Sequence, residues 1–231
     1  MHTSASVERS LTIQLETHYL LRAPSPVPER PLLVVAAHGY AMNPSVMLEL
    51  CQSVVSPHVL IASLEAPNQH YLTTKPGSEE IGFNWGTRAR WRTAIAAHHE
   101  MVLGVLEQCR EEFGITPDRS LLLGFSQPVG LNYRFAATYP EAIGGVIGIC
   151  GGVPRDWEQD GYQAVTAALL HIARDQDEYY PPEVAKQFAG RLRHRAAEVE
   201  FHLLSGPHRF PSSAGAIIQP WMRRVFPTAA L

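Results

Sequence analysis

The sequence has few cysteines and no long apolar segment. Its 231 residues include three cysteines, Cys51, Cys109 and Cys150, which are widely spaced in apolar surroundings. This odd number predicts reduced core thiols and not a disulfide framework. No apolar run approaches the ~18 residues that a membrane-spanning helix needs. The polar segment 1–10 lacks the apolar stretch of a signal peptide, so we expect a cytoplasmic protein without a membrane span.

An excess of charge of either sign is also lacking. The formal net charge is −3 at pH 7, and the basic residues form no block. Nucleic acid and anionic membranes are therefore not expected as partners. The sequence contains no HxExxH, CxxC or Gly-rich phosphate loop, and the adjacent His98 and His99 would point in different directions from a helix. We therefore expect no metal and no cofactor.

Strand-like and helix-like patterns alternate along the chain. An alternating pattern predicts an edge strand at 11–16, and apolar runs predict buried strands at 31–37, 58–64, 120–125, 142–150, 167–172 and 199–204. Helical patterns occupy about 41–55, 87–113, 128–139, 181–197 and 214–226, with a short helix expected between 160 and 167. This alternation predicts one α/β domain, 1–231, with a mainly parallel sheet and helices on both faces. In such a sheet, functional groups gather at the carboxyl ends of the strands.

Residues 65–86 interrupt this alternation. The segment contains prolines, glycines and the rings of Tyr71, Phe83 and Trp85. Irregular connections of this length are usually functional or disordered, and the rings favour a packed loop that shapes a substrate pocket. Together with Tyr40, Tyr179 and Phe210, these rings are candidates for an apolar acyl or alcohol pocket, although about half of the set could be plain core.

The segment 120–130 is the most informative. A short apolar run ends at Gly124, Ser126 follows, and a helical pattern then begins. This is the outline of a nucleophile elbow, a sharp strand-to-helix turn that holds a serine hydroxyl above the sheet. Pro128 replaces the second glycine of the usual G-x-S-x-G pattern; proline suits the first turn of a helix but disfavours helical dihedral angles at Gln127. The alternative is an ordinary buried strand, turn and helix with an incidental serine.

Two of the later predicted strands are each followed by titratable residues, the first by acidic residues and the second by a histidine. The first leads to Asp175, Asp177 and Glu178, and the second leads to His208. A serine hydroxyl needs a histidine that takes its proton, and the histidine needs a carboxylate that fixes its tautomer. We therefore expect His208 to be the base of Ser126, with the three carboxylates competing for the third role.

A possible second donor for an oxyanion follows the first central strand. The glycine of His38-Gly39 lets the backbone turn, so that the N–H of Tyr40 could face the same point as the N–H of Gln127. A simple turn at the end of a strand is the alternative.

These segments resemble the phospholipase/carboxylesterase branch of the α/β-hydrolases, which includes acyl-protein thioesterases. The resemblance rests on His38-Gly39, Gly124-Phe125-Ser126-Gln127, Asp177 four residues before Pro181, and Gly206-x-His208, and it covers about residues 31–226. It implies an α/β-hydrolase fold without a metal or organic cofactor. The acidic turn of the family reads Gly-x-x-Asp-x-x-Val-Pro, and this alignment selects Asp177 over Asp175, with Arg174 and Tyr180 in place of the glycine and the valine.

The sequence thus predicts a serine esterase. Ser126 would attack the ester, His208 would move the proton, Asp177 would orient His208, and the N–H groups of Tyr40 and Gln127 would hold the oxyanion. The resemblance points to small-molecule carboxylic esters of short to medium acyl length, with thioesters or lysophospholipids as the nearest variants. The sequence does not decide between a monomer and a homodimer. The alternatives are a non-catalytic, hydrolase-like binding protein and a serine peptidase with the same triad.

Overall fold

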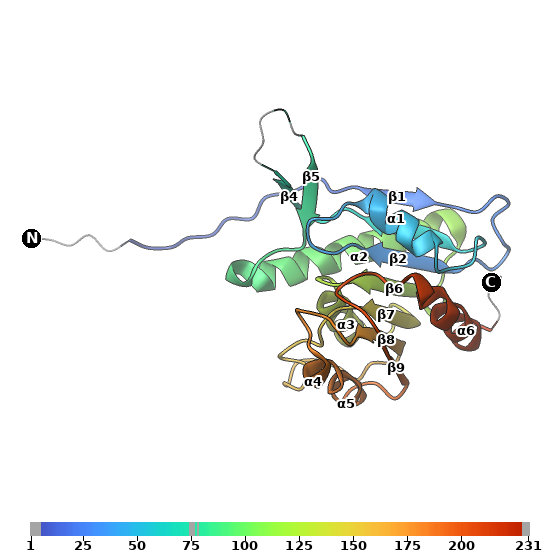
Figure 1. The fold of residues 1–231 in the computed structure, drawn as a ribbon. Coiled ribbons are helices and arrows are strands. Elements are labelled where there is room, and N and C mark those ends of the chain that lie inside the picture. The colour runs from blue at the N-terminus through green and yellow to red at the C-terminus, as the bar shows by residue number, and fades with distance from the viewer. Residues whose placement is uncertain (1–5, 74–76, 78, 228–231) are drawn as a thin grey trace, which may run out of the picture.

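A parallel sheet forms the centre of the molecule. The computed structural model describes residues 6–73, 77 and 79–227. Within these residues, seven strands form one sheet in the order β1-β3-β2-β6-β7-β8-β9, and only the β1–β3 pair is antiparallel (Figure 1). The strands are β1 (Tyr19–Arg22), β2 (Leu33–Ala37), β3 (Leu60–Leu64), β6 (Ser120–Phe125), β7 (Gly145–Ile149), β8 (Ala168–Arg174) and β9 (Val199–Leu204). The predicted mainly parallel sheet is confirmed.

Helices cover both faces of this sheet. They are α1 (Pro44–Gln52), α2 (Trp91–Phe113), α3 (Val129–Thr138), α4 (Pro182–Ala185), α5 (Phe188–Arg193) and α6 (Gly215–Val225). On one face, Met47 of α1 and Trp221 of α6 share a core with Val34; on the other, α2, α3 and α5 share a core with Val35. Successive side chains of a strand point to opposite faces, so a strand covered on both sides is mostly apolar. This explains the continuous apolar runs of the sequence.

Three of the predicted elements are wrong. Residues 11–16 form no strand: Leu11 is 82% exposed and Ile13 74% exposed, because the edge of the sheet is taken by β1, which pairs with β3. The segment 161–166 is built of turns and a single bridge, Val165 with Ala196, and not of a helix. The helix predicted over 181–197 is two short helices, α4 and α5.

The predicted irregular segment 65–86 contains a hairpin. β4 (Asn68–Tyr71) pairs antiparallel with β5 (Ile81–Asn84), and the hairpin projects from the body of the molecule (Figure 1). Polar residues dominate β4 because it lies away from the core, which removes the apolar pattern by which a strand is predicted. Residues 74–76 and 78 of this segment, like residues 1–5 of the N-terminal segment, lie outside the described residues.

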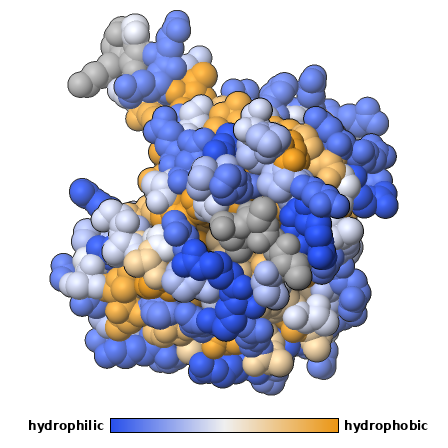
Figure 2. Space-filling view, turned by 90° about the vertical axis from the view of Figure 1, so that its right-hand side faces the viewer, coloured by the Kyte–Doolittle hydropathy of each residue, from blue (hydrophilic) through white to orange (hydrophobic). Residues whose placement is uncertain are grey.

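The three cysteines are free and buried, as expected of core thiols. None of the described helices is long and apolar enough to cross a membrane. On the side that faces right in Figure 1, hydrophilic and hydrophobic residues are interspersed over the surface (Figure 2).

Candidate active site

The sharp strand-to-helix turn predicted at Ser126 is present. Ser126 follows β6 with a φ of 64°, and α3 begins at Val129. A Cβ at Gly124 would lie 2.7 Å from Asn132 Nδ2 and 3.3 Å from the backbone N of Val129. Strand and helix therefore approach so closely that only glycine fits at position 124.

Pro128 fits the start of α3. Its φ of −77° and ψ of −9° are helical, and its carbonyl accepts hydrogen bonds from the N–H groups of Leu131 and Asn132, both at 2.9 Å. The further room that the turn needs comes from Gly151, after β7, where a Cβ would lie 2.2 Å from Val129 Cβ and 2.7 Å from the Ser126 carbonyl oxygen. Sequence reasoning missed this glycine, because its neighbour across the turn is not its neighbour in the chain.

The structure brings Ser126, His208 and Asp177 together at the carboxyl ends of β6, β9 and β8. His208 Nε2 lies 2.7 Å from Ser126 Oγ, and His208 Nδ1 lies 2.7 Å from Asp177 Oδ2. Asp177 is 3% exposed, and its Oδ1 accepts hydrogen bonds from the N–H groups of Tyr179 and Tyr180 at 2.9 and 3.0 Å. These two bonds fix the carboxylate, so its second oxygen is held against the imidazole ring.

The other two acidic candidates bind backbone and not the ring. Asp175 Oδ1 accepts a hydrogen bond from the N–H of Gly206 at 2.8 Å, and Glu178 Oε2 accepts one from the N–H of His208 at 3.3 Å. Hydrogen bonds from backbone N–H groups, that of His208 included, lower the pKa of Glu178. Both carboxylates thus contact the turn that carries His208, while Asp177 alone of the three contacts its ring.

The loop after β2 lines the same cavity as Ser126. Tyr40 and Gln127 line one cavity with Ser126, and the N–H of each has no hydrogen-bond partner among the described residues. The loop is anchored at His38, whose Nε2 accepts the N–H of Ala66 at 3.2 Å and whose carbonyl accepts Trp85 Nε1–H at 2.8 Å. Burial lowers the pKa of His38, which keeps the ring neutral and able to accept.

The end of the hairpin connects this loop to the turn at Ser126. The Gln127 side chain accepts the N–H of Trp85 at 3.0 Å and donates to the carbonyl of Gly86 at 2.9 Å. The N–H of Ala41 and the carbonyl of Met42 both bond to the backbone of Phe83 at 2.9 Å. The hairpin therefore holds both segments that carry the unpaired N–H groups, a role of the Gln127 side chain that no sequence pattern indicates.

The cavity above Ser126 has a volume of about 500 Å³. It is lined by Gly39, Tyr40, Phe125, Ser126, Gln127, Tyr179, Tyr180 and His208. The predicted Tyr40 and Tyr179 are among these residues, and the sequence analysis missed Phe125 and Tyr180. The ring centroids of Tyr179 and Phe125 lie 4.7 and 5.6 Å from that of His208. Burial, together with the nearby charge of Asp177, raises the pKa of Tyr180.

Four of the predicted pocket residues do not line this cavity. Tyr71 lies on the hairpin and is 69% exposed, Phe83 packs against the core, and Phe210 packs against Phe125 at a centroid distance of 5.7 Å. Trp85 is 1% exposed, because its indole N–H bonds to the carbonyl of His38 inside the protein. The rings of 65–86 thus lie outside the cavity above Ser126.

The adjacent histidines of α2 are core residues. Within the described part of the chain, no group of three or more His, Cys, Asp or Glu side chains could hold a metal ion. His98 Nε2 lies 3.0 Å from Asn132 Oδ1, and burial lowers the pKa of His98 to about 3 and that of His99 to about 4. Both rings are therefore neutral near pH 7 and pack under α3.

Comparison with known proteins identifies the fold. No protein-family model and no curated protein matches the chain. Among solved structures, esterase PE8 superposes with a TM-score of 0.75 at 18% identity, over 92% of this chain and 100% of that one. A carboxylesterase from Mesorhizobium loti matches with a TM-score of 0.70 at 18% identity, over 92% and 97% of the two chains. A phospholipase/carboxylesterase from Dyadobacter fermentans matches with a TM-score of 0.67 at 16% identity, over 90% and 97%. The chain therefore has the α/β-hydrolase fold.

Proposed function

We propose that the chain is a serine esterase of the phospholipase/carboxylesterase branch, with Ser126, His208 and Asp177 as its triad. The observation that carries the proposal is the continuous series of contacts from Asp177 through His208 to Ser126 Oγ, each 2.7 Å long. A neutral imidazole needs its proton on Nδ1 to accept from a serine hydroxyl through Nε2, and the Asp177 carboxylate stabilises that tautomer.

The reaction runs through an acyl-enzyme. Ser126 Oγ attacks the ester carbonyl carbon while its proton moves to His208 Nε2, and the imidazolium is stabilised by Asp177. The tetrahedral intermediate expels the alcohol, which takes the proton from His208. Water then gives a proton to His208 and attacks the acyl-enzyme, and the proton returns to Ser126 as the carboxylic acid leaves. No metal or cofactor is needed to balance these steps.

The N–H groups of Tyr40 and Gln127 hold the oxyanion in this proposal. Their lack of a partner in the described structure supports it, because an unpaired backbone donor beside a nucleophile is available to developing negative charge. The cavity of about 500 Å³ and its tyrosine and phenylalanine rings fit esters of short to medium acyl length. Thioesters and lysophospholipids are the nearest variants. Three free cysteines fit a cytoplasmic location.

Turnover of p-nitrophenyl butyrate by the purified protein tests the proposal. The wild type should release p-nitrophenol through a butyryl-enzyme, and this turnover should disappear in Ser126→Ala. A folded wild type with no activity on any chromogenic ester would favour a non-catalytic binding protein. Faster cleavage of peptide p-nitroanilides than of esters would favour a serine peptidase.

A further inference from the structure

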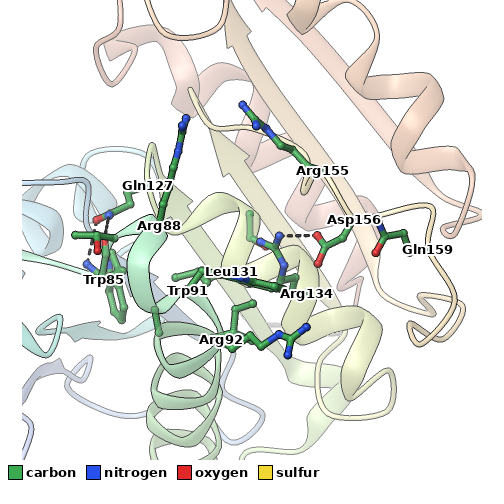
Figure 3. Close-up of a pocket in the computed structure, with 15 residues that line it drawn as sticks. Trp85, Arg88, Trp91, Arg92, Gln127, Leu131, Arg134, Arg155, Asp156 and Gln159 are labelled. Atoms are coloured by element: carbon green, nitrogen blue, oxygen red, sulfur yellow. Dashed lines mark hydrogen bonds and ion pairs between the residues drawn. The ribbon is translucent and has the colours of Figure 1, made fainter. Parts of the chain in front are cut away.

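A second cavity, of about 620 Å³, is shown with its lining residues in Figure 3. It lies between the start of α2, the start of α3 and the turn at 155–159. Gln127, the residue after Ser126, lines both this cavity and the cavity above the serine. The two cavities therefore lie next to each other, on the two sides of Gln127.

The charges around this second cavity are mostly positive. Four arginines line it, against one acidic residue, Asp156. Arg134 pairs with Asp156 at 2.5 Å, which leaves Arg88, Arg92 and Arg155 without a carboxylate partner in the described part of the chain. Figure 3 shows that Arg88 and Arg155 come from two separate segments, with the Arg134–Asp156 pair below them, between α3 and the turn at 155–159. The protein as a whole is slightly acidic, so this local excess of positive charge is not a general property of its surface.

The floor of the same cavity is apolar. Trp91, Ile95 and Leu131 line it, and Trp91 is 43% exposed. The guanidinium carbons of Arg92 and Arg134 lie 5.4 and 5.7 Å from the centroid of the Trp91 indole, which orients both cations at the cavity. A ligand that fits this lining has a short apolar portion and an anionic end, because free guanidinium groups bind carboxylate and phosphate oxygens with paired hydrogen bonds.

We infer that this cavity is a subsite for an anionic group, a carboxylate or a phosphate, carried by the ester substrate. The inference rests on the proposed esterase function and specifies its substrate class: esters with an acidic substituent on the acyl or the alcohol side. Arg88 and Arg155 contact the anion, and Gln127 separates it from the ester carbonyl at Ser126.

Two pairs of esters test this subsite. The acyl-side pair is p-nitrophenyl valerate and p-nitrophenyl hemiglutarate, which have acyl chains of equal length and differ by a terminal carboxylate. The alcohol-side pair is the butyryl ester of glycerol and that of glycerol 3-phosphate, followed by acid release. For each pair, the measured quantity is the ratio of kcat/KM for the anionic ester to that for the neutral ester. The proteins compared are the wild type, the double variant Arg88→Ala/Arg155→Ala, and Arg223→Ala.

In at least one pair, the double variant should lower this ratio by about tenfold relative to the wild type. Arg223→Ala is the control for loss of a surface arginine, because it removes one positive charge from an exposed position on α6; it should leave the ratio and the basal activity unchanged. Raising the ionic strength to about 0.5 M should lower the wild-type ratio as well, since these side chains are exposed to solvent. The affected pair tells whether the acid sits on the acyl or on the alcohol side.

The experiment distinguishes a failure of the subsite from a failure of the proposed esterase function. Wild-type turnover with ratios that the double variant leaves unchanged in both pairs would overturn the subsite and leave the esterase standing. A folded wild type that hydrolyses none of the four esters would overturn the esterase and the subsite together.

Discussion

Replacement of Asp177 by asparagine changes the chemistry of the candidate site without removing its geometry. The Oδ1 of an asparagine can still accept the N–H groups of Tyr179 and Tyr180, which the aspartate accepts at 2.9 and 3.0 Å. The amide NH₂ then faces His208 Nδ1, where the carboxylate oxygen now lies 2.7 Å away. An NH₂ group can only donate, so Nδ1 must accept and the ring proton must move to Nε2. The ring can then no longer accept the proton of Ser126.

The expected loss follows from this wrong tautomer. The corresponding change in a serine-protease triad costs about 10⁴ in kcat, which is about 5.4 kcal/mol of transition-state stabilisation at 1.36 kcal/mol per factor of ten. Asp175→Asn is the matched control, because the Asp175 side chain accepts the N–H of Gly206 at 2.8 Å and does not contact the His208 ring, and asparagine preserves that bond. We expect Asp175→Asn to lower kcat by less than about tenfold, since it leaves the His208 tautomer unchanged.

The assay is kcat for p-nitrophenyl butyrate, with thermal unfolding of each variant as the check on folding. Both variants should unfold within a few degrees of the wild type. A kcat for Asp177→Asn within tenfold of the wild type, or a larger loss in Asp175→Asn, would refute the reasoning from the tautomer.

Three further predictions follow from burial and backbone geometry. Burial lowers the pKa of His98 and of His171 to about 3, so the folded state binds fewer protons than the unfolded state below pH 6.5. Unfolding free energy should therefore fall by about 2 kcal/mol per histidine between pH 7 and pH 5 in urea titrations; a flat profile would contradict it. Pro128→Gly should change kcat by less than about tenfold and lower Tm, because the proline already has helical dihedral angles and restricts the unfolded chain; a hundredfold rise in kcat would mean that proline impairs the oxyanion site. Trp85→Ala should lower the free energy of unfolding by about 3–5 kcal/mol, because the indole is buried, and should change the ranking of esters by acyl length little. A changed ranking in a variant of wild-type stability would show that Trp85 contacts the substrate.

The local patterns of the sequence predicted the sheet and the turn at Ser126. Continuous apolar runs with helices between them correspond to β2, β3, β6, β7 and β8, because strands covered on both faces are mostly apolar, whereas β9 is half-buried and contains Glu200 and His202. The helical pattern predicted over 87–113 ends where α2 ends, at Phe113, because Gly114 adopts a φ of 66° without strain.

Features that depend on distant contacts could not be predicted. The alternation at 11–16 is that of an edge strand, but no strand of the described residues pairs with it, and Leu11 and Ile13 are exposed to solvent. The hairpin could not be predicted because β4 is polar and lacks an apolar pattern. Trp85 was predicted in the pocket but is buried in the core, where its indole N–H bonds to the carbonyl of His38. Pairing of this kind depends on which segments meet in space, which neither composition nor periodicity specifies.

Covalent labelling tests the central claim most directly. A fluorophosphonate reacts with a serine hydroxyl only where a base activates it and donors stabilise the charge on phosphorus-bound oxygen. Mass spectrometry of the wild type should find one adduct, on the peptide that carries Ser126, and ester hydrolysis should be lost in parallel. Ser126→Ala should fold normally and take up no label. Label on another serine, or an unlabelled wild type that still hydrolyses esters, would contradict the account.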